Sequence, residues 1–174
     1  MPVAVSTGGY REGQWVEIWD SEKTPSPGII SDGQRGWLDF NGGGGASEMR
    51  DWINHGYQGP ISVPCNIEGN PGTIASDVDE FNNRKGDVVY IPLYDTVSPH
   101  AGGTKATYHI VGFAAFKVGE VKSSGADKDK DKDKEDKDKT PSEKYITGQF
   151  VHYVTVGEFG GTFDGGVRVV HLSQ

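Results

Sequence analysis

Five histidines and one cysteine are the side chains of this 174-residue chain best suited to metal binding or nucleophilic chemistry. His109 and His152 fall in two long stretches that each predict a strand, so their imidazoles could face each other across a sheet. Two imidazoles and a carboxylate can bind a transition metal. Hydrogen-bonded histidines on a sheet are the commoner arrangement, so we predict no metal site and no cofactor, and keep His109 and His152 as weak candidates.

Cys65 is the only thiol, which excludes an intrachain disulfide and a multi-cysteine zinc site. It follows Pro64 in an extended stretch, with no helix N-terminus to lower its pKa. A structural thiol is therefore favoured over a catalytic one. Because no GxSxG elbow is present either, we expect no enzyme activity.

Two segments resemble ion-binding loops. Residues 41–45 (NGGGG) precede a predicted helix but lack both the Walker ending and the GxGxxG spacing, so they predict a flexible turn. Residues 127–139 alternate Asp and Lys, without the glycine and glutamate that a calcium loop needs at its sixth and twelfth positions. This segment predicts a disordered, low-complexity insert over residues 123–142 at the tip of a hairpin.

The tryptophans offer a second kind of binding site. Trp15, Trp19 and Trp37 could line a platform for a sugar, although tryptophans more often fill the core of a small domain. We therefore keep these three as weak ligand-binding candidates.

Charge and hydropathy exclude several classes of partner. The net charge is −8, so the chain repels nucleic-acid phosphates and anionic membranes. No apolar run approaches the roughly 20 residues needed to span a bilayer, and the first residues do not form a signal peptide. If the domain is exported, we expect its signal or anchor to lie outside this chain.

The hydrophobic patterning predicts one β-rich domain over residues 1–174. It belongs to the α+β class, with a mainly antiparallel sheet, or a small barrel, of about seven or eight strands. The two helices are predicted at residues 47–56, capped by Ser47 and Gly56, and at residues 73–85. The strands are predicted at residues 2–6, 15–19, 36–40, 61–63, 87–95, 104–121, 144–156 and 166–172.

Several of these segments together resemble the C-terminal domain of TadG-like proteins, bacterial surface proteins that accompany assembly of the Flp (tight-adherence) pilus. The most specific is YHIVGFAAF at residues 108–116. The resemblance covers nearly the whole chain except the Asp/Lys insert and the last dozen residues. The other matching segments are residues 2–5, 15–19, 36–40, 52–57, 69–72, 89–95 and 146–151.

The resemblance implies a location and a role, and it carries no catalytic residue. It implies a non-catalytic, extracytoplasmic assembly or adhesion domain, at the cell surface or secreted, whose partners are proteins of the pilus or cell envelope. The alternative from the residues themselves is a ligand-binding module for a carbohydrate or a metal.

Overall fold

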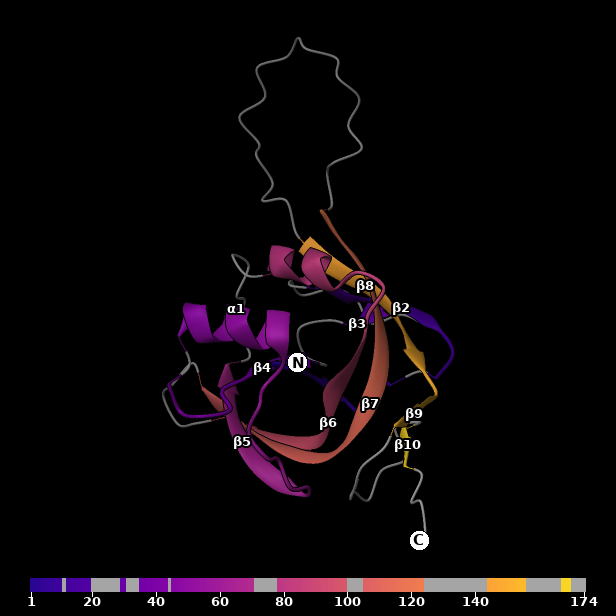
Figure 1. The fold of residues 1–174 in the computed structure, drawn as a ribbon. Helices are drawn as coiled ribbons and strands as arrows, with labels where there is room; N and C mark the ends of the chain where they lie inside the picture. The colour runs from indigo at the N-terminus through magenta and orange to yellow at the C-terminus, as the bar shows by residue number, and fades with distance from the viewer. Residues whose placement is uncertain are drawn as a thin grey trace, which may run out of the picture.

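The computed structural model describes residues 1–10, 12–19, 29–30, 35–43, 45–70, 78–99, 105–123, 144–155 and 167–169 (Figure 1). It is β-rich, as the sequence predicts, with an α-helix and a 3-10 helix in the described part. The helices are α1 (Ala46–His55) and η2 (Val78–Arg84). The strands are β1 (Val3–Ser6), β2 (Trp15–Trp19), β3 (Ile29–Ile30), β4 (Arg35–Leu38), β5 (Cys65–Asn70), β6 (Val88–Pro99), β7 (Ala106–Ser123), β8 (Lys144–Val151), β9 (Tyr153–Thr155) and β10 (Val167–Val169).

Eight strands form one mixed sheet in the order β3-β2-β8-β7-β5-β4-β1-β6, and β6 also pairs with β7. That additional pairing closes a ring of five strands, β7-β5-β4-β1-β6. Most pairings are antiparallel, but β1 runs parallel to β6 and β2 runs parallel to β3. In Figure 1, β6 and β7 curve together toward β5, which brings the two edges of the ring together. Strands β9 and β10 form a separate parallel pair.

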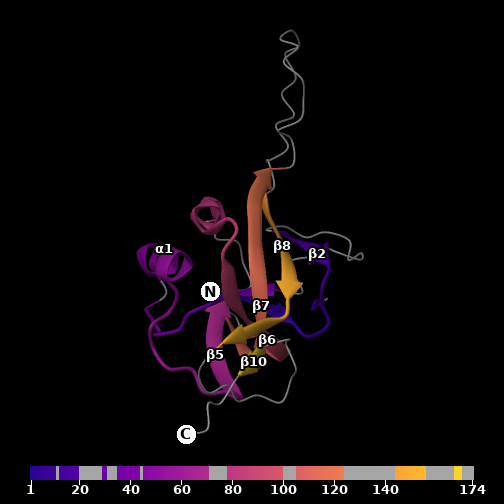
Figure 2. The ribbon, with the colours of Figure 1, turned by 45° about the vertical axis from the view of Figure 1, so that its right-hand side comes forward.

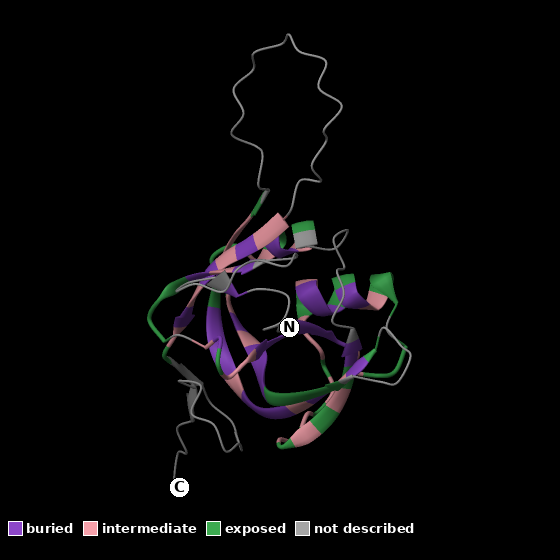
Figure 3. Ribbon diagram, turned by 180° about the vertical axis from the view of Figure 1, so that it is seen from behind, coloured by how far each residue is buried: buried purple, intermediate pink, exposed green. Residues whose placement is uncertain are grey.

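The buried side chains form two hydrophobic clusters, and alternation along a strand sends neighbouring residues to different clusters. Figure 3 marks the buried residues of the ribbon in purple. On β1, Val3 and Val5 enter the larger cluster while Ala4 enters the smaller one. The larger cluster lies under α1 and η2 and extends to β2 and β8 through Val16 and Phe150. The smaller one draws on all five ring strands, so it fills the interior of the ring; its buried members are Ala4, Leu38, Tyr94, Ala106, Tyr108 and Ile110.

Tyr108 fills the ring interior because two glycines leave room for its side chain. A Cβ built on Gly36 would lie 2.2 Å from Cζ of Tyr108, and one on Gly69 would lie 2.9 Å from Cε2. The ring of Tyr94 meets that of Tyr108 edge-on at 5.0 Å. A side chain at either glycine would therefore overlap with Tyr108, which is only 1% exposed.

Helix α1 packs with Met49, Trp52 and Ile53 buried, the stripe that the sequence predicts. It ends at Gly56, whose φ of 79° is accessible chiefly to glycine. The predicted cap Ser47 is wrong: the N-cap is Gly45, and Ser47 is exposed within the helix. Glu48 caps the first turn instead, because its carboxylate accepts from the backbone N–H of Gly45 at 3.3 Å.

Strands β7 and β8 form an antiparallel hairpin (Figure 2), and the Asp/Lys segment lies between them in the sequence. Ser123 pairs with Lys144, so the two ends of that segment lie side by side. Beyond Ser123, the predicted insert lies outside the described residues. Helix η2 packs near the tip end of the hairpin, where Asn82 accepts from the N–H of Val121 at 2.9 Å and Lys85 pairs with Glu120 at 2.8 Å.

Two further expectations need correction. The strand predicted at residues 61–63 is not paired in the sheet, and β5 begins only at Cys65. Of the helix predicted at residues 73–85, the described part is the 3-10 helix η2 from Val78, while residues 73–77 lie outside the described part.

Candidate functional site

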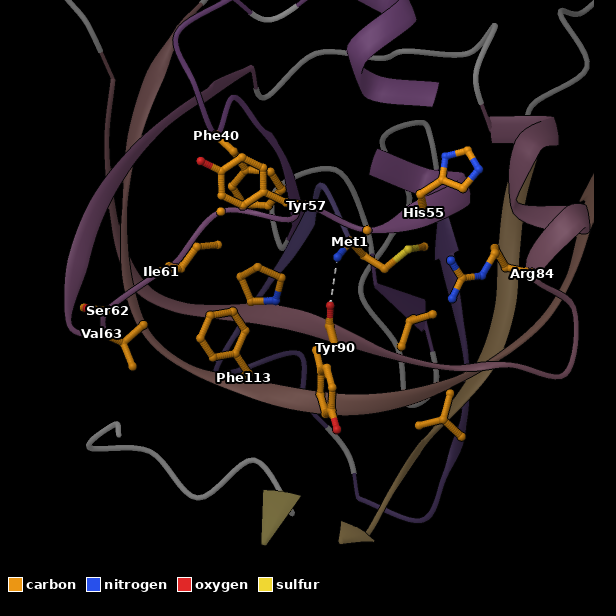
Figure 4. Close-up of a pocket in the computed structure, with 15 residues that line it drawn as sticks. Met1, Phe40, His55, Tyr57, Ile61, Ser62, Val63, Arg84, Tyr90 and Phe113 are labelled. Atoms are coloured by element: carbon orange, nitrogen blue, oxygen red, sulfur yellow. Dashed lines mark hydrogen bonds between the residues drawn. The ribbon is translucent and has the colours of Figure 1, made fainter. Parts of the chain in front are cut away.

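A cavity of about 620 Å³ opens at the mouth of the strand ring (Figure 4). Phe40 and Val63 line it and also pack against the cluster inside the ring, so the cavity continues the ring interior. Its volume lies within the range of small-molecule and peptide sites, which often occupy the mouths of β-barrels. The lining comes from segments between the N-terminal residue and β7: Met1, Phe40, His55, Gly56, Tyr57, Gly59, Ile61, Ser62, Val63, Arg84, Val88, Val89, Tyr90, Pro92 and Phe113.

One wall of the cavity is aromatic. Tyr57 stacks on Phe40 with ring centroids 4.8 Å apart and meets Trp52 edge-on at 5.8 Å. The Tyr57 ring also lies over Gly59, where a Cβ would approach its hydroxyl oxygen to 2.4 Å. Since Tyr57 is only half-buried, this wall presents rigid apolar surface to the cavity.

The α-amino group of Met1 lies beside the backbone of Tyr90 in the lining of the cavity. This group donates a hydrogen bond to the carbonyl oxygen of Tyr90 at 3.0 Å (Figure 4). Burial, and then the positive charge of Arg84, lower the pKa of the amine from 8.0 to about 5.

Arg84 is the charged side chain at the far end of the cavity. Its Nε donates to Oδ2 of Asp87 at 2.7 Å, and its Nη1 donates to the carbonyl oxygens of Asn54 at 2.6 Å and Ile53 at 3.4 Å. The second terminal nitrogen, Nη2, has no hydrogen-bond partner among the described residues. Within the described lining Arg84 is accompanied by no aspartate or glutamate, and its ion-pair partner Asp87 lies outside that lining.

The structure holds His109 and His152 apart. Because Ala115 pairs with Val151, His152 lies near the position opposite Ala114, roughly 16 Å along β7 from His109 at ~3.3 Å per residue. Each histidine contacts its own carboxylate: His109 Nδ1 lies 2.8 Å from Asp95 Oδ1, and His152 Nε2 contacts Glu12.

The contact with His109, chiefly its hydrogen bond, lowers the pKa of the Asp95 carboxyl. Among the described residues there is no group of three or more potential metal ligands. The facing pair of imidazoles that the sequence suggested is therefore not formed.

Cys65 lies at the start of β5, opposite Ile110 of β7, and does not line the cavity. Burial raises the pKa of its thiol, which disfavours the reactive thiolate. Its side chain packs against the cluster inside the ring, in the way expected of a structural thiol.

Of the three candidate tryptophans, the two with described side chains, Trp15 and Trp37, do not share a platform. Trp37 is 2% exposed and meets Phe81 edge-on at 6.0 Å within the core. Trp15 is 60% exposed on the outer face of β2, opposite Gln149 of β8. The side chain of Trp19 lies outside the described part. Core packing thus explains Trp37, and Trp15 remains available to a ligand.

The glycine turn before α1 is filled by the protein's own acceptors. Asn41 donates to Oε1 of Glu48 at 2.7 Å, and the N–H of Gly42 donates to Oδ1 of Asp39 at 2.8 Å. These carboxylates occupy the place that a phosphate would take, as expected of a turn rather than an anion site.

Neither described helix has the length and apolar character needed to cross a membrane. The cavity itself was missed by the sequence reasoning, although alternation over residues 57–63 was a usable signal. Comparison of the chain with protein-family models, curated proteins and solved structures finds no match, so the likeness to TadG-like proteins rests on the sequence motifs alone.

Proposed function

We propose that this chain is a non-catalytic, extracytoplasmic assembly domain that binds a protein partner of the pilus or cell envelope. The observation that carries the proposal is the aromatic-lined cavity at the mouth of the strand ring. Its walls offer apolar surface and a few polar groups, which is the composition of a recognition site. The resemblance to TadG-like proteins supplies the location and the class of partner.

The chemistry of the lining supports binding without turnover. Burial raises the pKa of the Cys65 thiol, and this thiol lies outside the cavity. His55, the histidine of the rim, pairs with Asp51 at 2.8 Å on the exposed surface of α1. In the described part of the lining, no nucleophile is paired with a base in the way that covalent catalysis requires.

Photo-crosslinking in cells tests this proposal. A photoreactive benzophenone side chain at Ile61 would enter the cavity, whereas the same group at Val97, which is 44% exposed on β6, would lie outside it. In cells that naturally produce the protein, we expect the Ile61 derivative to form an adduct with one envelope protein. The Val97 derivative should not form this adduct. Equal adducts from both positions, or none from Ile61, would contradict the proposal.

A carbohydrate site is the second candidate, because Trp15 is 60% exposed beside polar neighbours. Trp15 pairs across the strands with Gln149, and Glu17 pairs with Thr147 on the same outer face. An exposed indole beside hydrogen-bonding side chains suits stacking against a sugar. If this candidate is correct, Trp15→Ala should abolish calorimetric binding of a glycan that the native chain binds, while Val97→Ala should leave it intact.

A further inference from the structure

The segment of residues 57–63, between α1 and β5, alternates in burial as a strand does, but it pairs with no strand of the described sheet. Side chains at its odd positions are half-buried and line the cavity, while the even positions are exposed. The same alternation continues into β5, where pairing with β7 starts at Cys65. The residues that line the cavity are Tyr57, Gly59, Ile61 and Val63, with Ser62 at the rim.

The backbone of this segment has unused hydrogen-bonding capacity. Among the described residues, the C=O groups of residues 57–63 make no hydrogen bond, and neither do their N–H groups, which Pro60 lacks. The one polar side chain that anchors the segment, Gln58, donates to the carbonyl oxygens of His55 at 2.9 Å and Gly56 at 3.2 Å. Both carbonyls belong to the end of α1, so the backbone of the segment itself remains open to a partner.

The cavity beside this segment combines apolar walls with an arginine, Arg84, at one end. Phe113 and Tyr57 face the space from opposite sides, and Figure 4 shows the Arg84 guanidinium turned toward Met1 at the other end. Arg84 keeps Nη2 without a partner in the described part, and no carboxylate of that part lines the space. An incoming carboxylate would therefore find a free donor there.

We propose that the cavity binds an extended peptide of the partner protein, which adds as a strand along residues 57–63. Backbone hydrogen bonds to this segment would supply affinity, and alternate apolar side chains of the peptide would enter the cavity. A carboxylate of the peptide would contact Arg84. This inference rests on the proposed function and names how the partner is held.

The test uses a synthetic library of N-acetylated hexapeptides with a free C-terminal carboxylate. Alternate positions of each peptide vary over valine, isoleucine, phenylalanine and tyrosine. We expect members to bind the full chain and to slow amide hydrogen exchange within residues 57–63. Converting the C-terminus of the best binder to an amide should weaken it at least tenfold, and N-methylating alternate backbone nitrogens should abolish binding.

Two matched variants test whether the peptide binds in the cavity. Ile61→Arg should block the cavity and abolish binding, while Val97→Arg should leave the affinity unchanged within twofold. The N-methylated peptide tests the backbone hydrogen bonds without altering the protein. The test of strand addition therefore holds even if the Ile61→Arg variant fails to fold.

Three outcomes would overturn strand addition: no library member binding at 1 mM, equal binding of the N-methylated peptide, or equal binding of the amide and the acid. A partner crosslinked from Ile61 in cells together with any of these outcomes would keep the proposed function and reject this mode of binding. Peptide binding without a crosslinked envelope partner would reject the assembly role instead.

Discussion

Replacing Phe150 with alanine should lower the free energy of unfolding by about 3–5 kcal/mol, the range for deleting a buried phenylalanine side chain. Phe150 is fully buried on β8, where its ring meets those of Tyr10 at 5.0 Å and Phe116 at 5.1 Å edge-on. It therefore joins the N-terminal segment to the long hairpin, and its loss would leave a cavity between them. Thermal unfolding should show a fall in Tm on the order of 10 °C.

Two variants calibrate this result. Phe150→Leu keeps most of the buried volume, so it should lower the free energy of unfolding by less than half the amount expected for Phe150→Ala. Val97→Ala removes an exposed side chain and should change stability by about 0.5 kcal/mol or less. A cost below about 1 kcal/mol for Phe150→Ala would show that this ring does not pack as described.

Gly36→Ala should lower the free energy of unfolding by about 1–3 kcal/mol or more, because the ring interior has no room for a methyl group beside Tyr108. The new Cβ would lie 2.2 Å from Cζ and 2.4 Å from Oη of Tyr108. The φ of Gly36 is not positive, so the backbone itself would accept alanine and the cost is steric. Denaturant unfolding measures the loss directly.

A double-mutant cycle separates this contact from other effects. In a Tyr108→Ala background, Gly36→Ala should cost much less than in the native chain, because the clashing ring is gone. Gly8→Ala is the matched control, since its nearest neighbour would be the Ser6 Oγ at an ordinary 3.8 Å. An equal cost of Gly36→Ala in both backgrounds would contradict the steric explanation.

Local patterns predicted the individual elements well. Alternation along residues 144–151 placed Ile146 and Phe150 on one face, and both are buried. Helix α1 was found from its apolar spacing and from Gly56. Its start was misplaced because the helix already begins at Ala46, after Gly45, whose N–H donates to the carboxylate of Glu48 three residues later, so Ser47 lies within the first turn.

Non-local features were out of reach for the same reasoning. The closure of β6 onto β7 and the parallel step between β1 and β6 depend on how distant strands meet. The separation of His109 from His152 follows from the register that Ser123 and Lys144 set at the hairpin tip, which alternation alone does not fix. For the cavity, the sequence predicted an extended segment at residues 61–63, but it did not indicate that no strand of the described sheet would pair with this segment.

The pairing of Ser123 with Lys144 has a consequence for engineering. Strand ends that are already held together tolerate extra chain between them, because a longer loop adds little closure entropy and disturbs no packed residue. The tip of the hairpin is therefore a natural graft point, where a reporter or an epitope can be carried without touching the ring or its mouth. We therefore expect chains with a shorter or longer segment between Ser123 and Lys144 to keep the fold of the described residues.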